Sequence, residues 1–156
     1  MNKDNIEHIH LIRQYAKAWN NLSMEFVEPY LSEDFHFASQ IGFDEIKTKN
    51  EYLMYINEKF NIIKISNAEG DSFLNAEIGF YNNNPCLILL QIHNQPKMTG
   101  SLKRVEIDGK KEWVQSTSKA IETVMLVKCD KGKIVRSDLC VVPASYDIQR
   151  TGEIPL

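Results

Sequence analysis

The sequence lacks the features that identify several large classes of protein. Its seven glycines are isolated, so no glycine-rich loop is present to bind phosphate groups. The net charge is −3 and the basic residues are scattered, which argues against a nucleic-acid partner. The longest apolar run, residues 86–90, is far too short to cross a bilayer, and residues 1–14 hold no apolar core like that of a signal peptide. We therefore expect a cytoplasmic protein with neither a nucleic-acid nor a membrane partner.

Cysteines and patterns of metal ligands are also scarce. Cys86, Cys129 and Cys140 form an odd, widely spaced set on apolar stretches, as is typical of reduced thiols in the core of a cytoplasmic protein. No Cys-x-x-Cys or His-x-x-x-His pair occurs, and His8 and His10 would point to different sides of a helix. The sequence therefore predicts no metal site and no cofactor.

Helical periodicity is present in the first part of the chain. Asp4 can cap a helix in which apolar residues recur at helical spacing. Ser23 can cap a short second helix, which Pro29 limits. After a strand at about residues 35–39, a capping box at Thr48 and Glu51 opens a longer helix. The predicted apolar face of this helix contains Tyr52, Leu53, Ile56, Phe60 and Ile63.

The periodicity then falls to two. Two pairs of long strands, each joined by a hairpin turn, are predicted at residues 73–81 with 86–93 and at residues 119–129 with 133–142. Between the pairs, residues 94–118 are an expected insertion, in which Asp108-Gly109 turns a smaller hairpin. Helices followed by antiparallel strands define an α+β fold, and we expect residues 1–156 to form a single domain.

Residues 14–39, QYAKAWNNLSMEFVEPYLSEDFHFAS, resemble the nuclear transport factor 2-like superfamily, which includes SnoaL-like polyketide cyclases and ketosteroid isomerases. The resemblance rests on an aromatic-containing first helix, Asn20-Asn21, a short second helix, and the run from Leu31 to Asp34 that leads into a strand. It implies a cystatin-like α+β fold, with a strongly curved antiparallel sheet wrapped around the N-terminal helices as a conical barrel with an internal pocket. It also implies a homodimer that pairs through the sheet.

The isomerase branch of the superfamily offers a test of function. The resemblance places Tyr15 at the position of an oxyanion-binding tyrosine, Ser39 at the position of the carboxylate base, and Glu122 near the position of a protonated acid. An unactivated serine cannot abstract a proton from carbon at neutral pH, so the base is missing. We therefore do not expect steroid isomerisation.

His36 and Glu122 are weak candidates for another acid or base. His36 shares a strand face with Asp34, either as an oriented base or as a solvated side chain. Glu122 stands among apolar neighbours, where burial would raise its pKa, or it pairs with Arg136 or Lys119 across a hairpin. The residues expected to line the pocket are Tyr15, Trp19, Phe37, Tyr52, Tyr55, His93 and Glu122.

Three functions remain open. The first is binding of a small, partly apolar molecule without chemistry, which the missing base favours. The second is a cofactor-free isomerase, cyclase or hydrolase that uses His36 or Glu122. The third is a protein–protein interaction or immunity-type module that uses the convex face of the sheet and residues 94–118.

Overall fold

The computed structural model describes residues 3–40, 44–68, 72–94, 102–107, 110–115, 118–140 and 148–156. Its helices are α1 (Lys3–Asn21), the 3₁₀ turns η1 (Met24–Phe26) and η2 (Glu28–Tyr30), and α2 (Lys49–Ala68). The predicted cap of α2 is present, because the backbone N–H of Glu51 donates to Thr48 Oγ1 at 3.2 Å. Within the described residues, neither long helix is apolar enough to cross a membrane.

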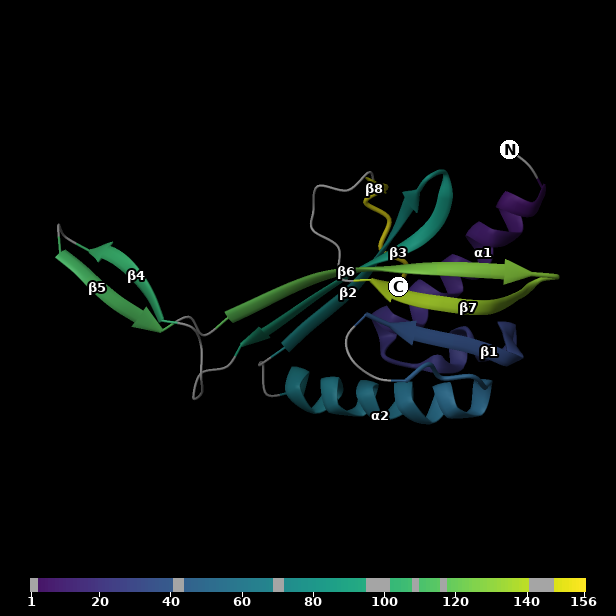
Figure 1. Cartoon of the computed structure of the whole chain (residues 1–156), viewed down its shortest axis with the longest axis horizontal. Coiled ribbons are helices and arrows are strands. Elements are labelled where there is room, and N and C mark those ends of the chain that lie inside the picture. The colour runs from purple at the N-terminus through teal and green to yellow at the C-terminus, as the bar shows by residue number, and fades with distance from the viewer. Residues whose placement is uncertain are drawn as a thin grey trace.

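Most of the strands form one curved sheet that stays open (Figure 1). Its strands, in spatial order, are β1 (Leu31–Ser39), β7 (Lys133–Cys140), β6 (Ser118–Asp130), β3 (Asn84–Asn94), β2 (Ser72–Tyr81) and β8 (Ile148–Arg150). A separate two-stranded sheet pairs β4 (Leu102–Ile107) with β5 (Lys110–Gln115), and Figure 1 shows it apart from the main sheet. The α+β class and the curved sheet expected from the resemblance are confirmed.

Both predicted hairpins between long strands are present. Asn82 and Asn83 turn β2 into β3, and Lys131 and Gly132 turn β6 into β7. All four residues have positive φ, between 48° and 75°, which is the geometry of a tight two-residue hairpin turn. Asparagine and glycine adopt this conformation with little strain.

The expectation of a wholly antiparallel sheet is wrong at one edge. β1 pairs with β7 in the parallel direction, so that Phe37 lies beside Ser137. No hairpin joins these two strands. Because α2, β2, β3 and β6 lie between them in the chain, a turn does not dictate their relative direction. The sheet is therefore mixed.

The core lies between the two long helices and one face of the sheet (Figure 1). From α1 and α2 it receives Trp19 and Phe60, whose rings meet edge to face with centroids 5.1 Å apart. From β1 it receives Phe37, which packs on Tyr52 at 5.0 Å. Leu87 and Leu89 of β3 are buried in the same core, so alternate residues of that strand face the helices.

The C-terminal residues fasten α1 to the edge of the sheet. Asn20, near the end of α1, exchanges hydrogen bonds with the backbone of Ala76 on β2 and donates to the carbonyl of Pro155 at 2.6 Å. The N–H of Ile78 donates to the carbonyl of Glu153 at 2.9 Å. The residues after β8 therefore extend its pairing along β2.

Candidate functional site

Two tyrosine hydroxyls meet inside the core. Tyr15 of α1 and Tyr52 of α2 are fully buried and hydrogen-bonded to each other, and Tyr15 also donates to the Met125 sulfur at 3.6 Å. Burial raises the pKa of Tyr15 to about 12 and raises the pKa of Tyr52 well above its usual value. Both phenols therefore stay protonated near neutral pH and can act as hydrogen-bond donors.

Two further polar atoms lie close to this tyrosine pair. Ser137 Oγ and Trp19 Nε1 are near enough to the Tyr15 hydroxyl to offset part of the effect of burial on its pKa. Both atoms are buried, yet neither has a partner with hydrogen-bond geometry. Buried polar groups in native proteins are almost always paired, often through water. The interior is therefore polar at this point, and its hydrogen bonds are incomplete.

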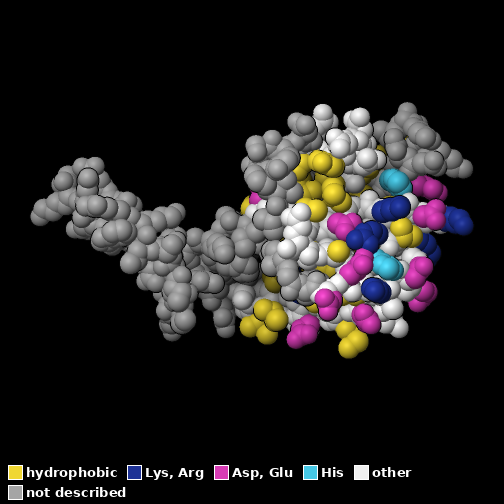
Figure 2. All heavy atoms as spheres, viewed as in Figure 1, with side chains coloured by type: hydrophobic (Ala, Val, Ile, Leu, Met, Phe, Trp, Pro, Cys, Tyr) yellow, Lys and Arg dark blue, Asp and Glu magenta, His cyan; other side chains and the backbone are white. Residues whose placement is uncertain are grey.

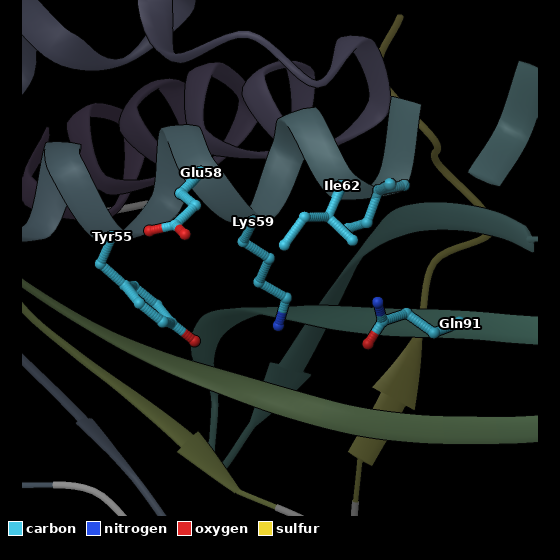
Figure 3. A pocket seen from close by; sticks show the side chains of 6 residues that line it. Tyr55, Glu58, Lys59, Ile62 and Gln91 are labelled. Atoms are coloured by element: carbon cyan, nitrogen blue, oxygen red, sulfur yellow. The ribbon is translucent and has the colours of Figure 1, made fainter. Parts of the chain in front are cut away.

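A pocket of about 420 Å³ opens beside this interior, between α2 and β3 (Figure 3). We call it the α2–β3 pocket, and the residues that line it are Tyr55, Glu58, Lys59, Ile62, Ile63 and Gln91. Tyr55 and Lys59 point from α2 towards the strands, while Gln91 of β3 points into the same space (Figure 3). The carboxylate of Glu58 stays beside α2 (Figure 3).

Lys59 is the unusual group in this pocket. Its side chain is partly buried, and its ammonium nitrogen lies over the Trp19 ring, 5.5 Å from the ring centre. Burial lowers the pKa of Lys59 because the charged form loses hydration. Among the residues that the structure describes, no carboxylate lies within ion-pair distance of it. Among the described residues, the face of the Trp19 ring is therefore the group that interacts with its charge.

The aromatic residues predicted to line a pocket have two different positions. Tyr55 lines the α2–β3 pocket, where partial burial raises the pKa of its phenol. Tyr15, Trp19, Phe37 and Tyr52 are each at most 1% exposed and belong to the packed core. They form the layer behind the pocket, since Tyr55 stacks near Phe37 with ring centroids 5.7 Å apart and Lys59 covers Trp19.

Glu122 does not line the α2–β3 pocket. Its neighbours on β6, Thr123 and Met125, are buried, and Met125 contacts Tyr15, so Glu122 points to the opposite face of the sheet. The Glu122 side chain is 41% exposed and lies 3.6 Å from Arg150. It is therefore a solvated partner of an arginine, although this arginine is neither of the two basic residues considered from the sequence.

His36 also lies on the face of the sheet away from the helices. Phe35 and Phe37 on either side of it are buried, whereas His36 is partly exposed, with Nδ1 3.4 Å from Glu45. Glu45 in turn pairs with Arg136, which lowers the pKa of the Glu45 carboxyl. Figure 2 shows charges of both signs mixed over this side of the molecule. This network resembles a hydrated charged surface rather than an enclosed site.

His93 completes the set of predicted site residues. Its backbone belongs to β3, but its side chain lies outside the described residues. No grouping of three or more potential metal ligands occurs among the described residues. The three cysteines are free, and burial raises the pKa of Cys86 to about 11 and that of Cys129 to about 12. These thiols are therefore poor nucleophiles.

Two further hollows lie near the hairpin turns. One of about 510 Å³ is lined from β2, β3 and β6, and one of about 270 Å³ is lined from α1 and the β6–β7 turn. His8 and Cys129 border both of them. Among the described side chains, none of the predicted lining residues reaches either hollow. The charged residues on their walls, such as Lys128 and Asp130, are exposed to water, unlike the partly buried Lys59. The α2–β3 pocket is therefore the stronger candidate for a site.

Lys59 and Gln91 were not predicted from the sequence, although each leaves a signal there. Lys59 lies seven residues after Tyr52 and four before Ile63, so helical spacing puts it on the buried face of α2. Gln91 shares a strand face with Leu87 and Leu89. A polar residue on an otherwise apolar, inward-facing row is the pattern that marks both.

No protein-family model matches the sequence, and neither does any curated protein sequence. Solved structures do match. A protein of unknown function from Mesorhizobium loti, described as like nuclear transport factor 2, superposes with a TM-score of 0.60 at 7% identity, over 92% of this chain and 97% of that chain. A proposed SnoaL-like polyketide cyclase from Jannaschia sp. CCS1 gives 0.57 at 9% identity, over 89% and 88%.

A third structure is a proposed ketosteroid isomerase from Kribbella flavida, with a TM-score of 0.55 at 15% identity over 90% of this chain and 82% of that chain. The chain is thus an α+β protein in which a curved, open sheet packs against two helices. Its fold is similar to that of these solved structures, as the sequence resemblance implied. At these identities the likeness defines the fold and leaves the function to the site.

Proposed function

We propose that the protein binds a small, partly apolar molecule in the α2–β3 pocket. The observation that carries this proposal is the composition of the pocket wall. Ile62 and Ile63 supply apolar surface, while Tyr55 and Gln91 supply hydrogen-bonding groups directed into the same space. A concave, mainly apolar surface with a few convergent polar groups is the usual form of a small-molecule site.

The proposal assigns no reaction to the pocket. The two candidate acid–base residues, His36 and Glu122, lie on the other face of the sheet. The resemblance places Ser39, which is no carboxylate, at the position of the isomerase base. Binding without a reaction requires no acid or base in the pocket, whereas each catalytic alternative that the sequence left open requires one. The cytoplasmic location and the homodimer remain parts of the proposal, and size-exclusion chromatography with light scattering tests the second.

A fragment screen by NMR on ¹⁵N-labelled protein tests the pocket. We expect aromatic and branched aliphatic fragments to shift the signals of Tyr55, Lys59 and Gln91. The variant Ile62→Trp is designed to block the pocket, since Ile62 lies on its wall and is 59% exposed, so that the larger side chain does not disturb the core. Ile62→Trp should abolish the shifts.

The matched control is Ile65→Trp. Ile65 lies on the same helix, is 63% exposed and does not line the pocket. The Ile65→Trp variant should bind the same fragments as the unmodified protein. Fragments that shift none of the pocket signals, or that bind equally well to Ile62→Trp, would contradict the proposed function.

A further inference from the structure

We infer that the molecule bound in the α2–β3 pocket is an anion, with a carboxylate or similar monoanionic group held by Lys59 and an apolar or aromatic body packed against Ile62 and Ile63. This inference rests on the proposed function, since it names the chemical class of ligand for the same pocket. It starts from a charge that the described part of the chain leaves without a counter-ion.

The position of Lys59 is costly for the protein without a ligand. A partly buried ammonium loses hydration, and a lysine on a helix surface normally extends into water to avoid that loss. Here the side chain points towards the strands instead (Figure 3). Its nitrogen lies over the Trp19 ring. The ring face attracts the cation but does not replace an ion pair. A ligand anion would supply the missing partner.

The other polar groups of the pocket suit the same kind of ligand. The Tyr55 phenol remains protonated because burial raises its pKa, and the Gln91 amide carries two N–H donors. Together with the Lys59 ammonium they place donors from α2 and β3 around one space (Figure 3). A carboxylate accepts several such hydrogen bonds, and charge-assisted bonds are stronger than neutral ones.

Glu58 is the opposing charge on the pocket wall. It is exposed and lies on the neighbouring position of α2, and its carboxylate stays beside the helix rather than pointing towards the strands (Figure 3). No ion pair joins it to Lys59 in the structure. Water therefore screens Glu58 more than Lys59, so the pocket retains a preference for anions.

Two probes that differ mainly in charge test the inference: 2-naphthoate and its neutral amide, 2-naphthamide. Isothermal titration calorimetry measures the affinity, and ¹⁵N NMR locates binding. We expect the wild-type protein to bind the naphthoate about 10-fold more tightly, as a charge-assisted contact would give. In Lys59→Met, which keeps most of the aliphatic stem, naphthoate should lose its advantage over naphthamide, so that the two probes bind about equally.

Lys64→Met is the matched control, because Lys64 is an exposed lysine of α2 outside the pocket. It should keep the preference for naphthoate, and Glu58→Gln should strengthen naphthoate binding about twofold. Equal binding of both probes by the wild-type protein, or a preference that survives Lys59→Met, would overturn the inference while leaving the pocket in place. If neither probe binds but the fragment screen finds ligands in the pocket, the anion inference alone fails; if neither experiment finds binding there, both fail.

Discussion

The ammonium group of Lys59 lies 5.5 Å above the centre of the Trp19 ring, at the boundary between the core and the α2–β3 pocket. Two opposing effects meet in this contact. The ring attracts the charge, whereas the lowered pKa of Lys59 shows that burial disfavours it. The lysine therefore lowers stability at neutral pH, and this cost decreases as the pH rises towards the usual lysine pKa.

The first prediction concerns that cost. Lys59→Met should raise the free energy of unfolding at pH 7 by about 0.5–1 kcal/mol, because it removes the buried charge and keeps the packing of the stem. Urea denaturation of both proteins measures the change. Lys64→Met, at an exposed position, should change stability by less than about 0.5 kcal/mol. A loss of stability in Lys59→Met would mean that the contact with Trp19 outweighs the loss of hydration.

The second prediction concerns the buried hydroxyls of Tyr15 and Tyr52. Tyr15→Phe leaves the Tyr52 hydroxyl buried without its partner, and Tyr52→Phe leaves the Tyr15 hydroxyl with only the weakly accepting Met125 sulfur, so each change should cost about 1–2 kcal/mol. Changing both removes the unsatisfied group, so the double variant should lose no more stability than the worse single variant. A double-mutant cycle by urea denaturation measures this coupling. Strictly additive losses would show that the two hydroxyls do not stabilise each other.

The third prediction concerns pH. Glu77 is 6% exposed and accepts hydrogen bonds from Arg150, which lowers the pKa of its carboxyl. The folded state therefore favours the ionised form. Its stabilising effect is fully present above the ordinary glutamate pKa, near 4.5, and is lost as the pH falls through the lowered value.

Glu77→Gln should accordingly cost about 1–2 kcal/mol at pH 7, since the half-exposed Arg150 limits the strength of the pair. The difference between the variant and the wild-type protein should shrink between pH 5 and pH 3. Denaturation at a series of pH values tests this. Glu153→Gln, which breaks the exposed pair with Arg13, is the control and should have a smaller effect at pH 7. A difference from wild type that does not depend on pH would refute the role given to Glu77.

The fourth prediction concerns the chain end. Deleting residues 151–156 removes the backbone hydrogen bonds of Ile78 with Glu153 and Thr151 and the bond from Asn20 to Pro155. We expect a loss of about 3 kcal/mol and a fall in melting temperature of roughly 5–10 °C. Deleting Leu156 alone, which is 82% exposed, should have no effect on thermal unfolding. An unchanged melting temperature in the longer deletion would show that the tail is dispensable.

The elements of the fold could be predicted from the sequence because each has a local physical signal. The buried residues of α2 (Tyr52, Ile56, Phe60 and Ile63) were all predicted from helical spacing. The two hairpin turns could be predicted because Asn82-Asn83 and Lys131-Gly132 contain residue types that favour the positive φ of such turns. The parallel pairing of β1 with β7 has no such signal, because it depends on contacts between residues about 100 positions apart in the chain.

The residues of the candidate site were harder to predict from the sequence for a related reason. β6 is apolar on both faces, so alternation alone could not decide whether Glu122 or Thr123 faces the helices. Aromatic residues predicted a cavity lining, yet Tyr15, Trp19 and Phe37 fill the space themselves. How far a core is filled depends on the packing of side chains from several elements, and no single segment carries that information.

The pairing of β8 and of the residues after it with β2 has a consequence for self-association. Open sheets risk growing edge to edge into aggregates, and proteins protect their edges with short strands, charges or covering segments. Here the three residues of β8 pair with residues 79–81 of β2, and Glu153 and Thr151 bond to the backbone of Ile78. At the other edge, β1 carries the exposed charges of Glu33 and Asp34 and bridges to Ile46 within the same chain. These features therefore disfavour extension of the sheet by a strand of another molecule at the covered positions.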